Sequence, residues 1–140
     1  MIKNALLISC ATVALSACIH QPNTQLQSGH SYQVEWIGER PLIDSSMLTL
    51  NLLDQTRATG LAGCNNWWAE YQLQGNQFSL SNIATTRKLC APALMEQEQR
   101  FLAALATLQR WEFAEHQQLL LWPAQGAPIK LWPLKQPLQK

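Results

Sequence analysis

Residues 71 to 80 read YQLQGNQFSL, and this stretch predicts a β-hairpin. Tyr71–Leu73 and Phe78–Leu80 each alternate apolar and polar residues, which is the period of a strand with one buried face. Gly75 and Asn76 lie between them, and both residue types suit a two-residue hairpin loop because they adopt positive φ at low cost. The stretch therefore favours a sheet in which neighbouring strands are joined by short turns.

Strand-like segments continue on both sides of this hairpin. Residues 31–38 (SYQVEWIG) place Tyr32, Val34 and Trp36 on one face, and residues 47–54 (MLTLNLLD) alternate less regularly. The remaining candidates are short and are separated by turn-rich spacers: residues 59–62, 82–88, 111–113, 119–122 and 129–134. No fixed-period repeat is present, so the chain is not a repeat array.

One segment has the period of a helix. In PALMEQEQRFLAALATLQRW, residues 92–111, the apolar residues at 94, 101, 105 and 108 fall on one stripe. Pro92 suits the first helical position, where its missing N–H is not needed. Glu96 and Glu98 are interpreted as solvated charges in or near the first turns, where the helix dipole favours acidic residues. We therefore expect a helix over about residues 92–110.

These elements together predict a mainly β (α+β) fold. Successive hairpins favour an antiparallel meander, curled or closed into a barrel-like sheet, with the inserted helix over an open end or face. A parallel sheet would need a helix after nearly every strand, and the pattern lacks them. The length of 140 residues suggests one domain.

The N-terminus predicts export. Lys3 is followed by an uncharged, largely apolar stretch from Ala5 to Leu15, too short for the ~20 residues of a membrane-spanning helix but typical of a signal peptide. Residues 15–18 (LSAC) resemble a bacterial lipobox, which implies that residues 1–17 are removed and that Cys18 is lipidated. Ile19 stands where an aspartate would mark the inner membrane, so the resemblance favours the periplasmic face of the outer membrane.

These features divide the chain into a signal peptide over residues 1–17, the lipidated cysteine and a polar tether over 18–29, and a folded domain over 30–140. Acyl chains on Cys18 would supply the membrane attachment. The formal net charge is +1, and only 14% of residues are charged, so the basic field typical of nucleic-acid binding is absent. The expected partners are the membrane and either an envelope protein or a small apolar ligand, with no nucleic acid.

Two cysteines of the folded domain, Cys64 and Cys90, allow three interpretations. An even number of cysteines in an oxidising compartment favours a disulfide. A zinc site would need four ligands at compatible spacing, and no histidine lies close in sequence to either cysteine. A nucleophilic thiol would need a base, for which only His116 is a candidate. We expect the disulfide, and neither a metal nor a cofactor.

The stretch GLAGCNNWW, residues 60–68, predicts a tight corner where a strand ends, because glycine and asparagine bond or turn the backbone readily. Alternatively, Asn65 and Asn66 present their amides to a ligand. If Trp67 and Trp68 are extended they point to opposite faces, so one should be exposed and could contact a glycan, an apolar ligand or a protein. The candidate binding residues are Asn65, Asn66, Trp67, Trp68 and Tyr71.

Residues 60–105 resemble the META domain, or HslJ-like, family. Gly63-Cys64-Asn65 and Tyr71 match its motif, as do Thr86 with Cys90, and Met95, Glu98 and Phe101-Leu102 in the helical segment. The resemblance covers nearly all of residues 30–134, although residues 67–70 replace a glycine that members often carry before the tyrosine. It implies a small barrel-like domain with one helix and links to envelope stress and antibiotic tolerance. It brings no catalytic residues.

Standard catalytic signatures such as G-x-S-x-G, H-E-x-x-H or a phosphate-binding glycine loop are absent from the sequence. The expected function is that of a non-enzymatic outer-membrane lipoprotein that acts in envelope stress or antibiotic tolerance through binding. One alternative is a periplasmic carrier that holds a small apolar ligand inside the barrel. Another is an inhibitor of a periplasmic enzyme that uses residues 64–70 as a contact loop.

Overall fold

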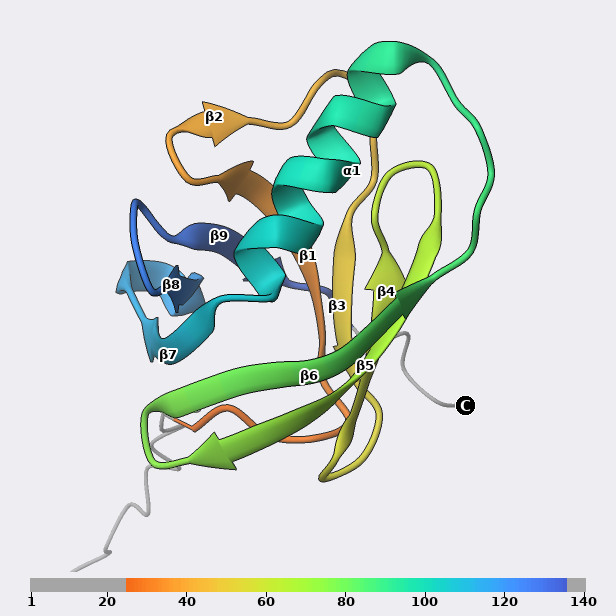
Figure 1. The fold of residues 1–140 in the computed structure, drawn as a ribbon. Helices are drawn as coiled ribbons and strands as arrows, with labels where there is room; N and C mark the ends of the chain where they lie inside the picture. The colour runs from red at the N-terminus through yellow and green to blue at the C-terminus, as the bar shows by residue number, and fades with distance from the viewer. Residues whose placement is uncertain (1–24, 136–140) are drawn as a thin grey trace, which may run out of the picture.

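The computed structural model describes residues 25–135, which form one helix and nine strands among other elements (Figure 1). The strands are β1 (Ser31–Ile37), β2 (Arg40–Pro41), β3 (Thr49–Leu52), β4 (Arg57–Leu61), β5 (Asn66–Gln74), β6 (Gln77–Thr85), β7 (Leu108–Phe113), β8 (Leu119–Pro123) and β9 (Ile129–Pro133). The helix α1 (Pro92–Leu105) lies between β6 and β7, and a short 3₁₀ turn, η1 (Glu115–Gln117), lies between β7 and β8.

Eight strands form a closed antiparallel barrel. The order in the sheet is β1-β3-β4-β5-β6-β7-β8-β9, and β9 pairs with β1 to close the ring, while the two-residue β2 pairs with the end of β1. Every pairing is antiparallel and follows chain order except at the closure. The predicted mainly β, barrel-like meander with one inserted helix is confirmed.

The β5–β6 hairpin has the predicted turn. Gln74 pairs with Gln77 across Gly75 and Asn76, and Gly75 has a φ of 56°, as required at the first position of a type II′ loop. Strand β5 is longer than the predicted Tyr71–Leu73, since it begins at Asn66. Residues 66–70 are therefore strand, and the proposed contact loop over residues 64–70 is wrong.

Helix α1 fills the region where β6 and β7 diverge, since only the pair Gln77 and Arg110 joins these strands. In Figure 1 the chain leaves β6, rises in a long connection and returns through α1 to β7. Phe101 and Leu105 of α1 are fully buried, and the Phe101 ring meets the Trp67 ring edge to face at 6.2 Å between centroids. The helix thus completes the core where the sheet alone is open.

The helix is shorter than predicted. It ends at Leu105, and Leu108 belongs to β7, where it pairs with Pro123 of β8. The Thr107 hydroxyl donates to the carbonyls of Ala103 and Ala104 and satisfies part of the last turn. Strand pairing outweighs the local helical pattern here, which is how tertiary context commonly overrides propensity.

Strand β1 contains a bulge that the sequence did not predict. Tyr32, Val34 and Ile37 are buried, whereas Trp36 is only half-buried. The register against β9 shifts between Val34 and Trp36, so two residues of β1 fit against one of β9. The expectation that Trp36 shares the inner face with Tyr32 and Val34 is therefore wrong.

The interior of the barrel is filled by side chains. The fully buried ones come from the strands and the helix and include Leu48, Leu50, Leu52, Trp67, Phe78, Phe101, Leu105, Leu119, Leu121, Ile129 and Leu131. These side chains pack together as the core of residues 25–135, in the place where a carrier would hold its ligand. The carrier hypothesis is therefore not supported.

The folded domain begins before residue 30. Leu26 is buried within the core, and the Gly29 N–H donates to the Leu52 carbonyl at 2.6 Å. The expected end of the tether at residue 29 is therefore too late. The signal peptide over residues 1–17 and the lipidation site Cys18 lie outside the described residues. Among residues 25–135, no helix has the length and apolar character needed to cross a membrane.

Candidate functional site

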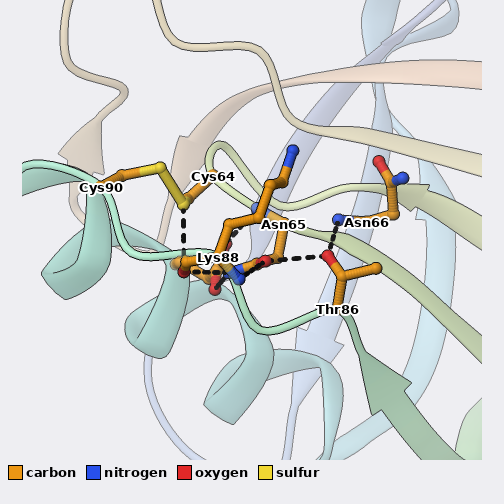
Figure 2. The surroundings of a disulfide bond; sticks show 7 residues. Cys64, Asn65, Asn66, Thr86, Lys88 and Cys90 are labelled. Atoms are coloured by element: carbon orange, nitrogen blue, oxygen red, sulfur yellow. Dashed lines mark hydrogen bonds between the residues drawn. A yellow bond between two sulfur atoms is a disulfide. The ribbon is translucent and has the colours of Figure 1, made fainter.

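Cys64 and Cys90 form a disulfide with 6.0 Å between their Cα atoms (Figure 2). The bridge links the corner before β5 to the connection that enters α1, two residues before the helix. The Cys64 sulfur also lies 3.5 Å from the Lys88 carbonyl, but a disulfide sulfur has no hydrogen to donate, so this is a packing contact. In this state neither sulfur is a free nucleophile, and residues 25–135 contain no cluster of acidic, His and Cys side chains that could hold a metal.

Asn65 is buried beside the disulfide and uses its whole amide internally. Its Nδ2 donates to Glu98 at 2.7 Å and to the Lys88 carbonyl at 3.2 Å. Its Oδ1 accepts from the Thr86 hydroxyl at 2.8 Å and from the Lys88 N–H at 2.7 Å (Figure 2). A side-chain amide has two donors and two acceptor positions, and all are taken. The hypothesis that Asn65 presents its amide to a ligand is wrong.

Glu98 is a core residue and not a solvated one. Its exposed fraction is 4%, and its two carboxylate oxygens accept from the Asn65 N–H and the Asn65 Nδ2, each at 2.7 Å. The expectation of a solvated charge holds for Glu96, which is exposed and pairs with Arg40 at 3.0 Å. Glu98 lies four residues after Leu94 and three before Phe101, so its place on the apolar stripe is the signal that sequence reasoning missed.

Gln97 is a second buried polar residue of α1 that sequence reasoning missed. Its Oε1 accepts from the Ile43 N–H at 2.8 Å, and its Nε2 donates to the Ser46 hydroxyl at 2.9 Å. Gln97 therefore fixes the segment between β2 and β3 against the helix. Its neighbours in sequence, Glu96 and Glu98, gave no indication of this role.

Trp67 and Trp68 point to opposite faces, as their alternation predicts. Trp67 has an exposed fraction of 1%, and its indole N–H donates to the Thr49 carbonyl at 3.2 Å. Gly60 permits this arrangement, because a Cβ there would lie 1.9 Å from the Thr49 oxygen and 2.7 Å from Trp67 Nε1. Trp67 is therefore part of the core, and its assignment as a binding residue is wrong.

Tyr71 is also internal. It is buried in β5, packs against Phe78 with 5.7 Å between ring centroids, and donates its hydroxyl to the Asp54 carbonyl. Burial and the nearby Asp54 charge raise the pKa of Tyr71. Because the hydroxyl is occupied and the ring is covered, Tyr71 is a packing residue and its assignment to a binding site is wrong.

Of the five candidate binding residues, Asn66 and Trp68 face outward. Trp68 has an exposed fraction of 47%, because its cross-strand neighbours on β4 and β6 are the small residues Thr59 and Ala84. Leu61, at the end of β4, and Leu53, just after β3, are also exposed and line the grooves beside Trp68. We call these two residues together with Trp68 the Trp68 surface. Two open grooves of about 400 and 410 Å³ meet at Trp68. This surface is what remains of the predicted site.

The sequence model of the META domain matches residues 24–136. The chain belongs to the META domain family. The motif residues Cys64, Asn65 and Glu98, which carried the resemblance, are the ones that the structure brings together around the disulfide. In this META domain the motif therefore maintains the junction between the barrel and α1.

Two solved structures share this fold. An NMR structure of a protein from Burkholderia xenovorans has a TM-score of 0.68 and 19% identity, over 91% of this chain and 100% of its own. A second NMR structure has a TM-score of 0.60 and 20% identity, over 75% of this chain and 89% of its own. At this identity the similarity shows a common fold and no activity. No curated protein matches the chain.

Proposed function

We propose that the protein is a non-enzymatic lipoprotein anchored through Cys18 to the periplasmic face of the outer membrane, and that it acts in envelope stress or antibiotic tolerance by binding another envelope protein. The observation that carries the binding role is Trp68, a large aromatic side chain that is half-exposed on β5, a strand paired on both sides. Aromatic residues in such positions supply much of the energy of protein–protein contacts.

The position of the Trp68 surface supports binding from outside. Side chains fill the interior of the barrel, whereas Leu53, Leu61 and Trp68 expose apolar side chains beside the outer grooves. Arg57 and Glu70 line one of the grooves beside Trp68 and add charges at its rim. An apolar centre with a polar rim is the common composition of a protein interface.

Crosslinking in intact cells tests the binding role. We expect the wild-type chain to capture a defined envelope protein and Trp68→Ala to lose it, while Leu89→Ala keeps it. Leu89 is a matched control because it is an exposed apolar residue in the connection before α1 and lines neither of the grooves at Trp68. Capture that is equal in wild type and Trp68→Ala would contradict the proposal.

Labelling with palmitate tests the anchor separately. The LSAC motif supports lipidation, so the wild-type chain should incorporate label and fractionate with outer membranes. Cys18→Ser should do neither, with Cys10→Ser as the matched control that remains labelled. An unlabelled wild-type chain would refute the anchor and leave the Trp68 proposal to its own test.

A further inference from the structure

We propose that this META domain has a second binding site, for a neutral glycan, in the groove between β1, β9 and residues 41–46. The groove has a volume of about 520 Å³, within the range of small-ligand sites. Trp36, Trp132, Glu35, Asp44 and Ser46 are among its lining residues. The site does not include Trp68, so it is independent of the function proposed above.

The floor of the groove is produced by the bulge in β1. Regular alternation would place one residue between the inward-facing Val34 and the next inward residue, but here both Glu35 and Trp36 lie between Val34 and Ile37. Both side chains are thereby available on the outside of the barrel. β-Bulges commonly re-aim side chains beside functional sites.

Trp132 of β9 completes the floor. It lies opposite Gln33 in the β1–β9 pairing, and its indole N–H donates to Glu35 at 2.8 Å. Gln118, between η1 and β8, also donates to the same Glu35 oxygen at 3.4 Å. These contacts fix the Trp132 ring and the Glu35 carboxylate relative to each other, which is the preorganisation that a binding site needs.

The wall of the groove is held from the core. Gln97, fully buried in α1, accepts from the Ile43 N–H and donates to the Ser46 hydroxyl. The Ser46 hydroxyl in turn donates to the Ile43 carbonyl at 2.8 Å. Between them Ser45 has a φ of 63°, a conformation that costs free energy for a non-glycine residue and is typically kept where the surroundings enforce it.

The charges around the groove select a neutral ligand. Glu35 and Asp44 line it and would repel an anion. A cation is disfavoured because Lys130 already lies over the Trp36 ring, 5.3 Å from its centroid, and would repel a second positive charge at that ring. A ligand with many hydroxyls and no charge satisfies both constraints.

The side chains fit a sugar in particular. One face of a sugar ring presents C–H groups, which pack on the electron-rich face of an indole, and its edge presents hydroxyls. Carboxylates accept from such hydroxyls, and the Ser46 oxygen, whose hydrogen is donated to Ile43, keeps one lone pair to accept from another. An extended peptide is less suitable, because β1 is already paired on both sides, with β3 and with β9, and offers no free edge for strand addition.

Titration of the detergent-purified full-length chain with an N-acetylglucosamine tetramer tests the proposal, with tryptophan emission and calorimetry as readouts. We expect saturable binding, weakened about tenfold or more in Trp132→Ala because a stacking surface is lost. Trp122→Ala is the matched control, since it also removes a part-exposed tryptophan from a strand of the barrel but lies outside the groove, and it should bind as wild type. Circular dichroism checks that both variants are folded.

Gln97→Leu tests the wall. Leucine is similar in size to glutamine and suits the core, but it cannot form the hydrogen bonds to Ile43 and Ser46. The chain should therefore remain folded and bind the tetramer more weakly. Absence of binding up to about 10 mM tetramer, or equal affinity in wild type and Trp132→Ala, would overturn the proposal. Binding of a tetralysine peptide at Trp132, without binding of the N-acetylglucosamine tetramer, would also overturn the proposal.

Discussion

At the scale of the residue, Asn65 shows why the Gly-Cys-Asn sequence folds as it does. Gly63 has a φ of 102°, which turns the chain at the end of the corner, and Cys64 ties that corner to the approach of α1. Asn65 then joins this corner to two other segments, the connection after β6 through Thr86 and Lys88, and α1 through Glu98. Asn65 therefore stabilises the junction between the barrel and α1 and does not bind a ligand.

Replacing Asn65 by alanine should lower the free energy of unfolding by about 2–4 kcal/mol, because the buried Glu98 carboxylate and the Lys88 N–H would lose partners. Urea unfolding followed by tryptophan fluorescence measures this. Asn66→Ala is the matched control, since Asn66 is exposed and engages Thr86 through its backbone, and it should change stability by less than about 0.5 kcal/mol. Equal losses in the two variants would contradict this account.

Asp54 gives a prediction about pH. Its carboxylate accepts from the Thr56 N–H and from Arg57, and these bonds lower the pKa of Asp54 to about 2. Because the pKa of Asp54 in the folded protein lies below the ordinary value of 3.8, the contribution of Asp54 is present above about pH 4 and is lost as the pH falls towards 2. In urea unfolding at stepped pH, the stability difference between wild type and Asp54→Asn should therefore shrink over this window. A difference that stays constant from pH 5 to about 2 would show that these bonds are not what stabilises the turn.

At the scale of the element, Gly60 is required for β3, β4 and β5 to pack. A Cβ at this position would lie 1.9 Å from the Thr49 carbonyl oxygen, which is backbone and cannot move independently. Gly60→Ala should therefore destabilise the domain by about 3 kcal/mol or more. Gly126→Ala is the control: nothing lies within 4 Å of its added Cβ, so only the strain of its φ of 90° remains, about 1–2 kcal/mol. Thermal unfolding of the two variants should separate them clearly.

The disulfide joins the corner before β5 to the connection before α1, across a sequence separation of 26 residues. The chain-entropy model gives a loop of this length about 3.5 kcal/mol, so a Cys64→Ala/Cys90→Ala variant should unfold at a correspondingly lower urea concentration. Reductant should destabilise the wild type and leave the double variant unchanged. Mass measurement before and after reduction of the wild type reports the bridge directly, and two free thiols in the unreduced protein would contradict it.

Sequence patterns predicted the structure correctly where residues close in sequence determine it. The alternation of Trp67 and Trp68 gave their opposite faces, and Gly75-Asn76 gave the hairpin. Prediction from sequence failed where groups distant in sequence determine the structure. The β-bulge at Glu35 depends on the register with β9, and the burial of Glu98 depends on Asn65. The helix end at Leu105 likewise follows from the pairing of β7 with β8, which no local window contains.

At the scale of the whole molecule, closure of the barrel joins the two ends of the domain. β1 and β9 are nearly a hundred residues apart in sequence, and their pairing removes both free edges of the sheet. Inward-facing residues of β1 and β9 meet in the core, so a filled barrel leaves only its outer surface for recognition. The Trp68 surface and the groove at Trp132 both lie on that outer surface.

The closure should therefore contribute to global stability and not behave as a loosely attached edge. Leu131 is fully buried in β9, opposite Val34 of β1 and Leu119 of β8. Leu131→Ala should lower the free energy of unfolding by about 2–5 kcal/mol through lost burial and a residual cavity. Lys130→Ala, its outward-facing neighbour, should cost far less, because only the contact with Trp36 is removed.

Circular dichroism and tryptophan fluorescence should report the same midpoint for Leu131→Ala, since β1 and β9 unfold together with the rest of the barrel. Amide hydrogen exchange gives the sharper measurement, because β9 amides in the wild type should exchange as slowly as those of the core strand β3. Fast exchange confined to β9 would show that the ring opens locally. The barrel would then have a free edge at β1, and the groove at Trp132 would lack the fixed floor on which glycan binding depends.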